Sequence, residues 1–184
     1  MRRALRVHPD GARGPVTRIE VEIARPDPAV LELTYELTGR TEELRIPPPA
    51  PPERANGLWR HTCFEAFLRP TAGEGYLEFN FSPSGRWAAY RFGRYRDGMA
   101  PLEDLAAPAV SSAARADGLT LRTQLDLSGA PELAAGETWR LGLSVVIEDM
   151  FGAISHWALA HPPGKPDFHH ADGFACQVRA PEDA

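Results

Sequence analysis

The sequence has only two cysteines, Cys63 and Cys176, among its 184 residues. This scarcity excludes a disulfide-stapled secreted scaffold, and we expect both thiols to be buried and free. No apolar run approaches the roughly 20 residues that span a bilayer. No apolar segment follows the basic N-terminal residues, as a signal peptide would require. We therefore expect a cytoplasmic protein without a membrane anchor.

An excess of basic residues is also lacking, since the net charge is −5. A nucleic-acid-binding domain usually has a basic face, so nucleic acid is not an expected partner. The sequence has no Gly-rich phosphate loop, because Gly73-Glu74-Gly75 is typical of a hairpin turn. It also lacks the Gly-x-Ser-x-Gly motif of serine hydrolases. These absences remove several common enzyme classes.

Long amphipathic helices are absent too, and alternation of apolar and polar residues dominates instead. In residues 16–24, for example, Ile19, Val21 and Ile23 alternate with charged or polar side chains. Because successive strand residues point to opposite faces, this pattern predicts half-buried strands. The predicted strands are 16–24, 30–38, 43–46, 61–69, 75–82, 86–93, 119–127, 139–148, 154–160 and 173–179.

About nine to eleven short strands separated by turns predict an all-β fold, an antiparallel β-sandwich of two sheets. The length fits a single domain over residues 1–184, with a core at about 15–180. We expect the proline-rich stretch 47–52 to be a stiff surface loop. We also expect a loop over about 97–118, which is rich in Ala, Pro and Ser.

The candidate site lies on the strands that flank Asn80. Alternation sends the phenylalanines beside Asn80 into the core and leaves Glu78 and Asn80 on the outer face. We assign Trp87 and Arg91 of the next strand to that face, and Glu65 from the strand before. Carboxylates, an amide, a guanidinium and an aromatic ring suit the hydroxyls and C–H faces of a sugar. The alternative is a solvated sheet face with weak cross-strand ion pairs.

Two catalytic alternatives remain open. Glu65 and Glu78 could form the carboxyl pair of a glycosidase, although both would project from one flat surface. His161 and His169 could converge on a metal, but their spacing matches no zinc pattern, so structural roles are favoured. Haem is a further alternative, with Met99, Met150 or a histidine as axial ligand, although no attachment motif is present. The sequence therefore favours a non-catalytic domain with no cofactor, and we assign no catalytic or metal-binding residue.

Several segments resemble the DOMON-like superfamily, which is related to family 9 carbohydrate-binding modules. Its motif is matched by Tyr76–Arg96, with the core Glu-Phe-Asn-Phe-Ser-Pro-Ser-Gly-x-Trp, and by Leu58–Leu68, which leads into the acidic Glu65. Residues 136–148 resemble its later core strands. His161–Phe174, with Pro-Asp-Phe-His-His at 166–170, resembles the closing motif of a small stand-alone bacterial branch. The resemblance covers about 15–180.

This resemblance implies a β-sandwich that binds a ligand, a sugar or haem. Relatives clamp sugar between two tryptophans, for which Trp59, Trp87 and Trp157 are candidates. Without an export signal, an intracellular sugar, a sugar nucleotide or a cell-wall precursor is favoured over a polysaccharide. The predicted ligand-binding residues are Trp59, Glu65, Glu78, Asn80, Trp87, Arg91, Arg96, Trp157, Asp167 and His169.

Three functions follow, in this order: a domain that binds a carbohydrate-like small molecule, a carboxylate- or metal-dependent hydrolase, and a protein-interaction scaffold. A groove lined by Glu65, Glu78 and an aromatic ring would support the first. Paired buried carboxyls or a bound metal would support the second, and a flat sheet with a large apolar patch the third. The ligand and the oligomeric state stay open.

Overall fold

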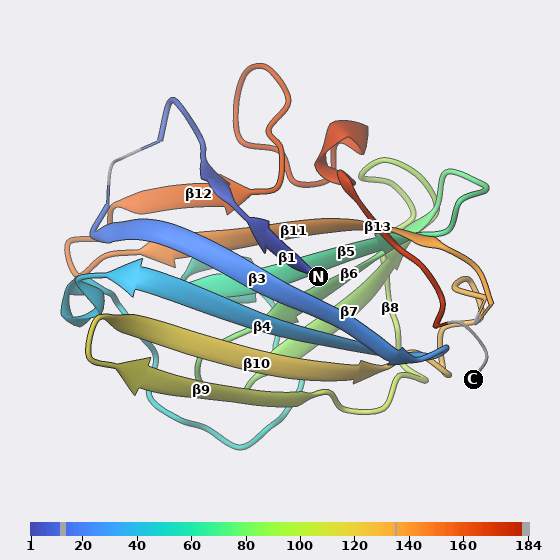
Figure 1. Cartoon of the computed structure of the whole chain (residues 1–184), viewed down its shortest axis with the longest axis horizontal. Coiled ribbons are helices and arrows are strands. Elements are labelled where there is room, and N and C mark those ends of the chain that lie inside the picture. Colours follow the sequence, from blue (N-terminus) through green and yellow to red (C-terminus); the bar gives the residue numbers. More distant parts are fainter. Residues whose placement is uncertain (12–13, 135, 182–184) are drawn as a thin grey trace.

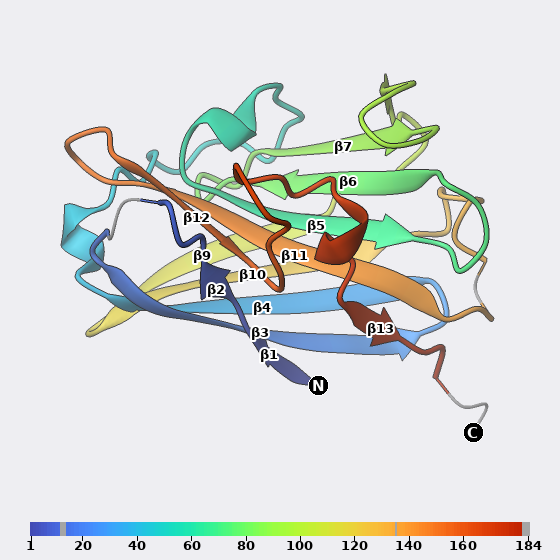
Figure 2. The same cartoon turned by 90° about the horizontal axis from the view of Figure 1, so that it is seen from above.

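The structure is a computed structural model that describes residues 1–11, 14–134 and 136–181. Two antiparallel β-sheets pack face to face, and Figure 2 shows them edge-on as two layers. The all-β sandwich predicted from the sequence is confirmed. The described residues form thirteen strands, more than expected, because several are only two or three residues long.

The first sheet, sheet A, lies nearer the viewer in Figure 1. Its strand order is β1 (Arg2–Ala4), β3 (Val16–Asp27), β4 (Val30–Gly39), β10 (Gly118–Asp126) and β9 (Ala109–Arg115).

The second sheet, sheet B, carries the candidate site. Its order is β2 (Arg6–Val7), β12 (Ile154–Ala158), β11 (Trp139–Glu148), β5 (Cys63–Arg69), β6 (Tyr76–Phe81), β7 (Trp87–Phe92) and β8 (Ala100–Pro101), and β13 (Cys176–Val178) also pairs with β11. The consecutive strands β5, β6 and β7 are neighbours, so residues close in sequence are brought side by side.

The core between the sheets follows the predicted alternation. Phe79 and Phe81 of β6 are fully buried there, and Tyr35 of β4 packs edge-on against Phe64 of β5 across the sandwich. The Tyr35 hydroxyl donates a 2.9 Å hydrogen bond to the backbone carbonyl of Glu65, which satisfies a polar group inside the apolar layer. This bond ties sheet A to the strand that carries a candidate site residue.

Two expectations about local structure are wrong. Residues 109–115, within the predicted loop 97–118, form the edge strand β9. Their side chains are mostly exposed, so no apolar alternation marks this strand. The predicted strand at 43–46 is instead the end of the short 3-10 helix η1 (Thr41–Glu43), followed by a single bridge from Leu44 to Asp149.

Other local predictions agree with the structure. Residues 47–52 contain no regular element, as expected for a proline-rich loop. Cys63 and Cys176 are both buried and free. Two further 3-10 helices, η2 (Leu58–Arg60) and η3 (Ala171–Gly173), are a single turn each. Nowhere in the described ranges is a helix long and apolar enough to cross a bilayer.

Candidate functional site

The outer face of sheet B is covered rather than solvated. It carries Phe67 of β5, with Tyr76, Glu78 and Asn80 of β6, all buried or nearly so. In Figure 2, η2 and its loop (teal) lie beyond sheet B on the side away from sheet A, and η3 (red) lies in front of β5 and β11. The cover comes from segments near 57–61, 93–99 and 160–174. The sequence pointed to single residues of these segments as ligand-binding, but because the segments lack alternation it did not predict that they cover the sheet.

An aromatic cluster fills one part of the space under the cover. Tyr76 stacks on Phe92 with ring centroids 4.8 Å apart, and Phe67 and Phe174 pack beside them. Such ring contacts add packing energy beyond burial and fix the orientation of the rings. The cluster therefore forms a rigid wall next to the polar part of the face.

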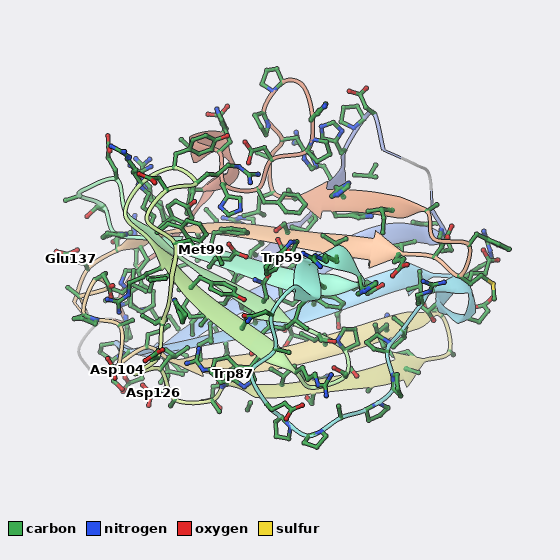
Figure 3. All side chains as sticks on the ribbon, turned by 180° about the vertical axis from the view of Figure 1, so that it is seen from behind. Trp59, Trp87, Met99, Asp104, Asp126 and Glu137 are labelled. Carbon is green, nitrogen blue, oxygen red and sulfur yellow. The ribbon has the colours of Figure 1, made fainter. Side chains whose placement is uncertain are left out.

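The remaining space is a cavity of about 370 Å³. Its lining combines acidic, basic and aromatic side chains: Trp59, Glu65, Glu78, Phe92, Arg96, Met99, Val146, His156, Pro166, Phe168 and His169. Figure 3 shows Trp59 and Met99 on the sheet B side of the sandwich, in front of its strands. The volume lies in the range of small-molecule sites.

Two carboxyl groups form the floor of the cavity. Glu65 of β5 lies directly opposite Asn80 of β6, which places Glu78 diagonally across from it on the same face. Ser144 of β11 donates a 2.9 Å hydrogen bond to Glu65, and the Asn80 amide donates one of 2.6 Å to Glu78. Glu65 is thus held in place from the neighbouring strand β11, and Glu78 by a residue of its own strand.

Burial changes the protonation of these groups. Burial, and then the charge of Glu78, raise the pKa of Glu65 to about 8. Burial also raises the pKa of Glu78, although the bond from Asn80 and the charge of Arg96 oppose that rise. At neutral pH Glu65 is therefore mostly protonated and can donate a hydrogen bond.

His169 lies at the junction of the cavity and the aromatic cluster. Its Nδ1 is 2.8 Å from the Tyr76 hydroxyl, and its ring packs edge-on against Phe67 and Phe92. Burial, and then the charge of Arg96, lower the pKa of His169 to about 4. The imidazole is therefore neutral near pH 7, with one nitrogen protonated.

Arg96 and Asp167 form the rim. Arg96 donates a 2.8 Å hydrogen bond to Asp167, which also accepts one of 2.5 Å from Tyr95. Burial acts to raise the pKa of Asp167, but the bonds from Tyr95 and Arg96 outweigh it and lower that pKa. The Arg96 backbone has a φ of +52°, in the left-handed region.

The structure brings most of the predicted residues together. Trp59, Glu65, Glu78, Arg96 and His169 line the cavity. Asn80 and Asp167 each contact a lining residue: Asn80 donates a hydrogen bond to Glu78, and Asp167 accepts one from Arg96.

The prediction that Trp87 and Arg91 share this face is wrong. Trp87 pairs with the inward-facing Phe81 and packs in the core, and Arg91, opposite Leu77, forms an ion pair with Glu132. Trp157 is also packed in the core between the sheets. Of the three tryptophans considered for a clamp, only Trp59 therefore lines the cavity.

Sequence reasoning missed several lining residues. Val146 follows the outward-facing Ser144 by two positions, so alternation on β11 could have found both. His156 lies opposite Val146 on β12. Pro166 and Phe168 belong to the motif at 166–170, but the loop has no periodicity that predicts their contact with sheet B.

The histidines of the C-terminal loop have separate partners. His161 lies 2.8 Å from the backbone carbonyl of Arg6 and packs against His8, whereas His169 contacts Tyr76. His170 caps η3 by accepting a hydrogen bond from the Asp172 backbone. Within the part of the chain that the structure describes, no group of three or more His, Cys, Asp or Glu is arranged to hold a metal ion.

No family model matches the chain, and no curated protein matches its sequence significantly. Solved structures do match. A "putative carbohydrate-binding protein" from Bacteroides uniformis has a TM-score of 0.66 at 15% identity, over 94% of this chain and 83% of that one. A family 9 carbohydrate-binding module from Caldicellulosiruptor kristjanssonii, in complex with glucose, has a TM-score of 0.61 at 9% identity, over 94% and 81%.

A structure of a Caldicellulosiruptor kristjanssonii family 9 module in complex with cellotriose has a TM-score of 0.56 at 10% identity, over 89% of this chain and 74% of that one. At such identities the likeness is one of fold. The sequence resemblance is confirmed at that level: this chain is a β-sandwich like that of family 9 carbohydrate-binding modules.

Proposed function

We propose that the chain binds a carbohydrate in the cavity on the outer face of sheet B. The observation that carries the proposal is the composition of the cavity, which sets the polar floor of Glu65 and Glu78 against the aromatic rings of Trp59, Phe92 and Phe168. A sugar has hydroxyls around its edge and C–H groups on its faces. The floor offers hydrogen bonds to the hydroxyls, and the rings offer apolar contact to the C–H groups.

The size of the site fits one sugar unit or a short chain. The cavity of about 370 Å³ is near the lower end of the range for small-molecule sites. The structural neighbours in complex with glucose and cellotriose have the same sandwich fold. They support a saccharide as the first ligand class to test, in place of haem or a protein partner.

Thermal unfolding in the presence of sugars tests the proposal. Purified protein is screened against glucose, cello-oligosaccharides, sugar nucleotides, haem and divalent metals. A ligand at 100 times its dissociation constant stabilises the folded state by about 2.7 kcal/mol. We expect a saccharide to raise the unfolding temperature, and Glu78→Gln to diminish that rise.

The matched control is Glu53→Gln, which removes an exposed carboxylate paired with Arg86. This variant should respond to the saccharide as the wild type does. A rise with haem or a metal alone would contradict the proposal, as would an undiminished saccharide response in Glu78→Gln.

One observation favours hydrolysis of a glycosidic bond as a second function. Glu65 is mostly protonated at neutral pH because burial raises its pKa to about 8, while Glu78 beside it accepts a hydrogen bond from Asn80. Glycosidases use such an acid together with a carboxylate. We rank binding first because Glu65 and Glu78 both project from the same face of sheet B. The two carboxyls of a glycosidase lie on opposite sides of the bond that breaks.

Release of reducing sugar from cello-oligosaccharides, whose leaving group must be protonated, tests the second function. Hydrolysis predicts release that is lost in Glu65→Gln, because the amide cannot act as an acid. Saccharide binding without any release, in wild type and variant alike, would reject hydrolysis and leave the binding function intact.

A further inference from the structure

The contacts of His169 define which of its ring nitrogens carries the proton. Its Nδ1 lies 2.8 Å from the hydroxyl of Tyr76, and its Nε2 lies 3.8 Å from Oε2 of Glu78. Tyr76 and Glu78 are two residues apart on β6, so both side chains leave the same face of the strand. The imidazole is thus held between the Tyr76 hydroxyl and the Glu78 carboxyl, and the other hydrogen bonds of these two groups indicate what each offers to the ring.

The Tyr76 hydroxyl already accepts a hydrogen bond of 3.2 Å from the backbone N–H of Arg96. A phenol has one proton to donate, and Nδ1 of His169 is the acceptor within reach. With that proton donated to Nδ1, the single proton of the neutral imidazole lies on Nε2. This tautomer also directs N–H, and not a lone pair, toward the carboxylate of Glu78.

The gap between His169 and Glu78 is too long for a direct hydrogen bond. The two atoms are 3.8 Å apart, whereas N–H···O bonds measure about 2.7–3.2 Å. Oε1 of Glu78 is occupied by the Asn80 amide at 2.6 Å, and both His169 and Glu78 line the cavity. A donor at Nε2 and an acceptor at Oε2 therefore stand side by side at the cavity surface.

We propose that His169 and Glu78 form a donor–acceptor pair that recognises one hydroxyl group of the ligand, and that Tyr76 positions this pair by fixing the tautomer of His169. The inference rests on the proposed carbohydrate function. A hydroxyl accepts one hydrogen bond and donates another, so it satisfies both atoms at once. Burial supports the assignment because it lowers the pKa of His169 to about 4 and keeps the ring neutral.

This pair selects among ligand groups. An ether oxygen or a fluorine accepts from His169 but gives nothing to Glu78. An ammonium group donates to Glu78 but leaves the His169 N–H without an acceptor. A phosphate or carboxylate oxygen is repelled by the negative charge of Glu78. The corner between His169 and Glu78 therefore takes a neutral hydroxyl, which favours neutral sugars over sugar acids and sugar phosphates at this position.

Long-range ¹H–¹⁵N correlation spectra of the histidine rings test the tautomer without any ligand. We expect the wild type to show His169 with the proton on Nε2. Tyr76→Phe removes the donor to Nδ1 and should give a mixture of tautomers. Tyr90→Phe is the matched control, since the Tyr90 hydroxyl donates to Asn56 on the same face. A proton on Nδ1 in the wild type would overturn the inference.

Titration with glucose and its monodeoxy and monodeoxyfluoro analogues tests the recognition of a hydroxyl. We expect one ring position at which either replacement weakens binding at least about tenfold, because a bond to a charged acceptor is lost. In Glu78→Gln the penalty of the fluoro analogue at that position should largely disappear. His169→Gln should likewise reduce the penalty of the deoxy analogue.

The outcomes separate this inference from the proposed function. If glucose binds but every deoxy analogue binds equally well, the donor–acceptor pair is rejected and carbohydrate binding stands. The same holds if one position is sensitive to the same degree in wild type and Glu78→Gln. If none of the sugars binds, both proposals are rejected together.

Discussion

The hydroxyl of Ser144 donates a 2.9 Å hydrogen bond to Glu65 from the neighbouring strand β11. This bond holds an acid that burial keeps protonated, since burial and the charge of Glu78 raise its pKa to about 8. A neutral acid at the cavity floor offers a ligand a donor where an ionised carboxylate would offer only acceptors.

The first prediction concerns stability at alkaline pH. The pKa of Glu65 rises from 4.5 in the unfolded chain to about 8 in the folded one, so its favourable contribution is present below pH 4.5 and is lost as pH rises toward 8. At pH 9 the variant Glu65→Gln should therefore be more stable than the wild type, by up to about 5 kcal/mol. Urea unfolding at several pH values measures this difference.

The comparison variant is again Glu53→Gln, an exposed site. Its difference from the wild type should stay nearly constant with pH. If Glu65→Gln also keeps a constant difference from pH 5 to pH 9, the account of a buried neutral acid is wrong.

The second prediction concerns acid. Burial, and then Arg96, lower the pKa of His169 from 6.5 to about 4, so the folded state loses stability as pH falls from 6.5 toward 4. The loss from His169 reaches about 3 kcal/mol. Burial also lowers the pKa values of His156 and His161, so these two histidines likewise reduce the stability of the folded state as pH falls. His169→Gln should show a shallower decline of unfolding free energy.

His170→Gln serves as the control, because His170 is the neighbouring histidine and its side chain is more exposed. Its stability profile should follow that of the wild type between pH 4 and pH 7. Equal slopes for His169→Gln and the wild type would show that His169 is not buried as a neutral ring.

The third prediction separates the tryptophans. Trp59 lines the cavity and is 38% exposed, with its ring edge-on to Tyr90 at 6.1 Å. Trp59→Ala should weaken sugar binding about threefold to tenfold, since one aromatic contact is lost. Trp87→Phe, within the core, should lower stability and leave affinity nearly unchanged. Calorimetric titration with the sugar found in the screen measures both affinities, and a larger loss in Trp87→Phe would reverse the assignment.

The fourth prediction tests the register of sheet A. A Cβ on Gly118 of β10 would lie 1.9 Å from the backbone oxygen of Leu37 on β4, so the strands would have to separate. Gly118→Ala should therefore destabilise the protein by about 1–3 kcal/mol or more. At Gly136 nothing lies within 4 Å of the added carbon, so Gly136→Ala should be nearly neutral. Equal stability of the two variants would contradict this register.

The sequence predicted the floor of the site because alternation is strong there. Phe79 and Phe81 leave one choice of inward face, which places Glu78 and Asn80 outward. In residues 87–92 both faces carry large or apolar side chains, with Trp87 and Ala89 on one and Tyr90 and Phe92 on the other. Alternation alone could not choose between them.

The turn settles the choice at β7. Ser82 donates its backbone N–H to the Arg86 carbonyl, and Phe81 therefore pairs with Trp87. Residues that face each other across an antiparallel pair share a face, so Trp87 follows Phe81 into the core. The cover over sheet B could not be predicted in this way. Its lining residues Met99 and Phe168 come from loops, where contacts depend on the fold of the whole chain.

Chemical-shift mapping with the sugar found in the screen tests the central claim most directly. Backbone amide spectra are recorded during titration of the ¹⁵N-labelled protein. We predict saturable shifts clustered at Trp59, Glu78 and His169, with the outer side of sheet A unaffected. Shifts confined to sheet A, or none at sugar concentrations up to the solubility limit, would contradict the claim that this cavity binds carbohydrate.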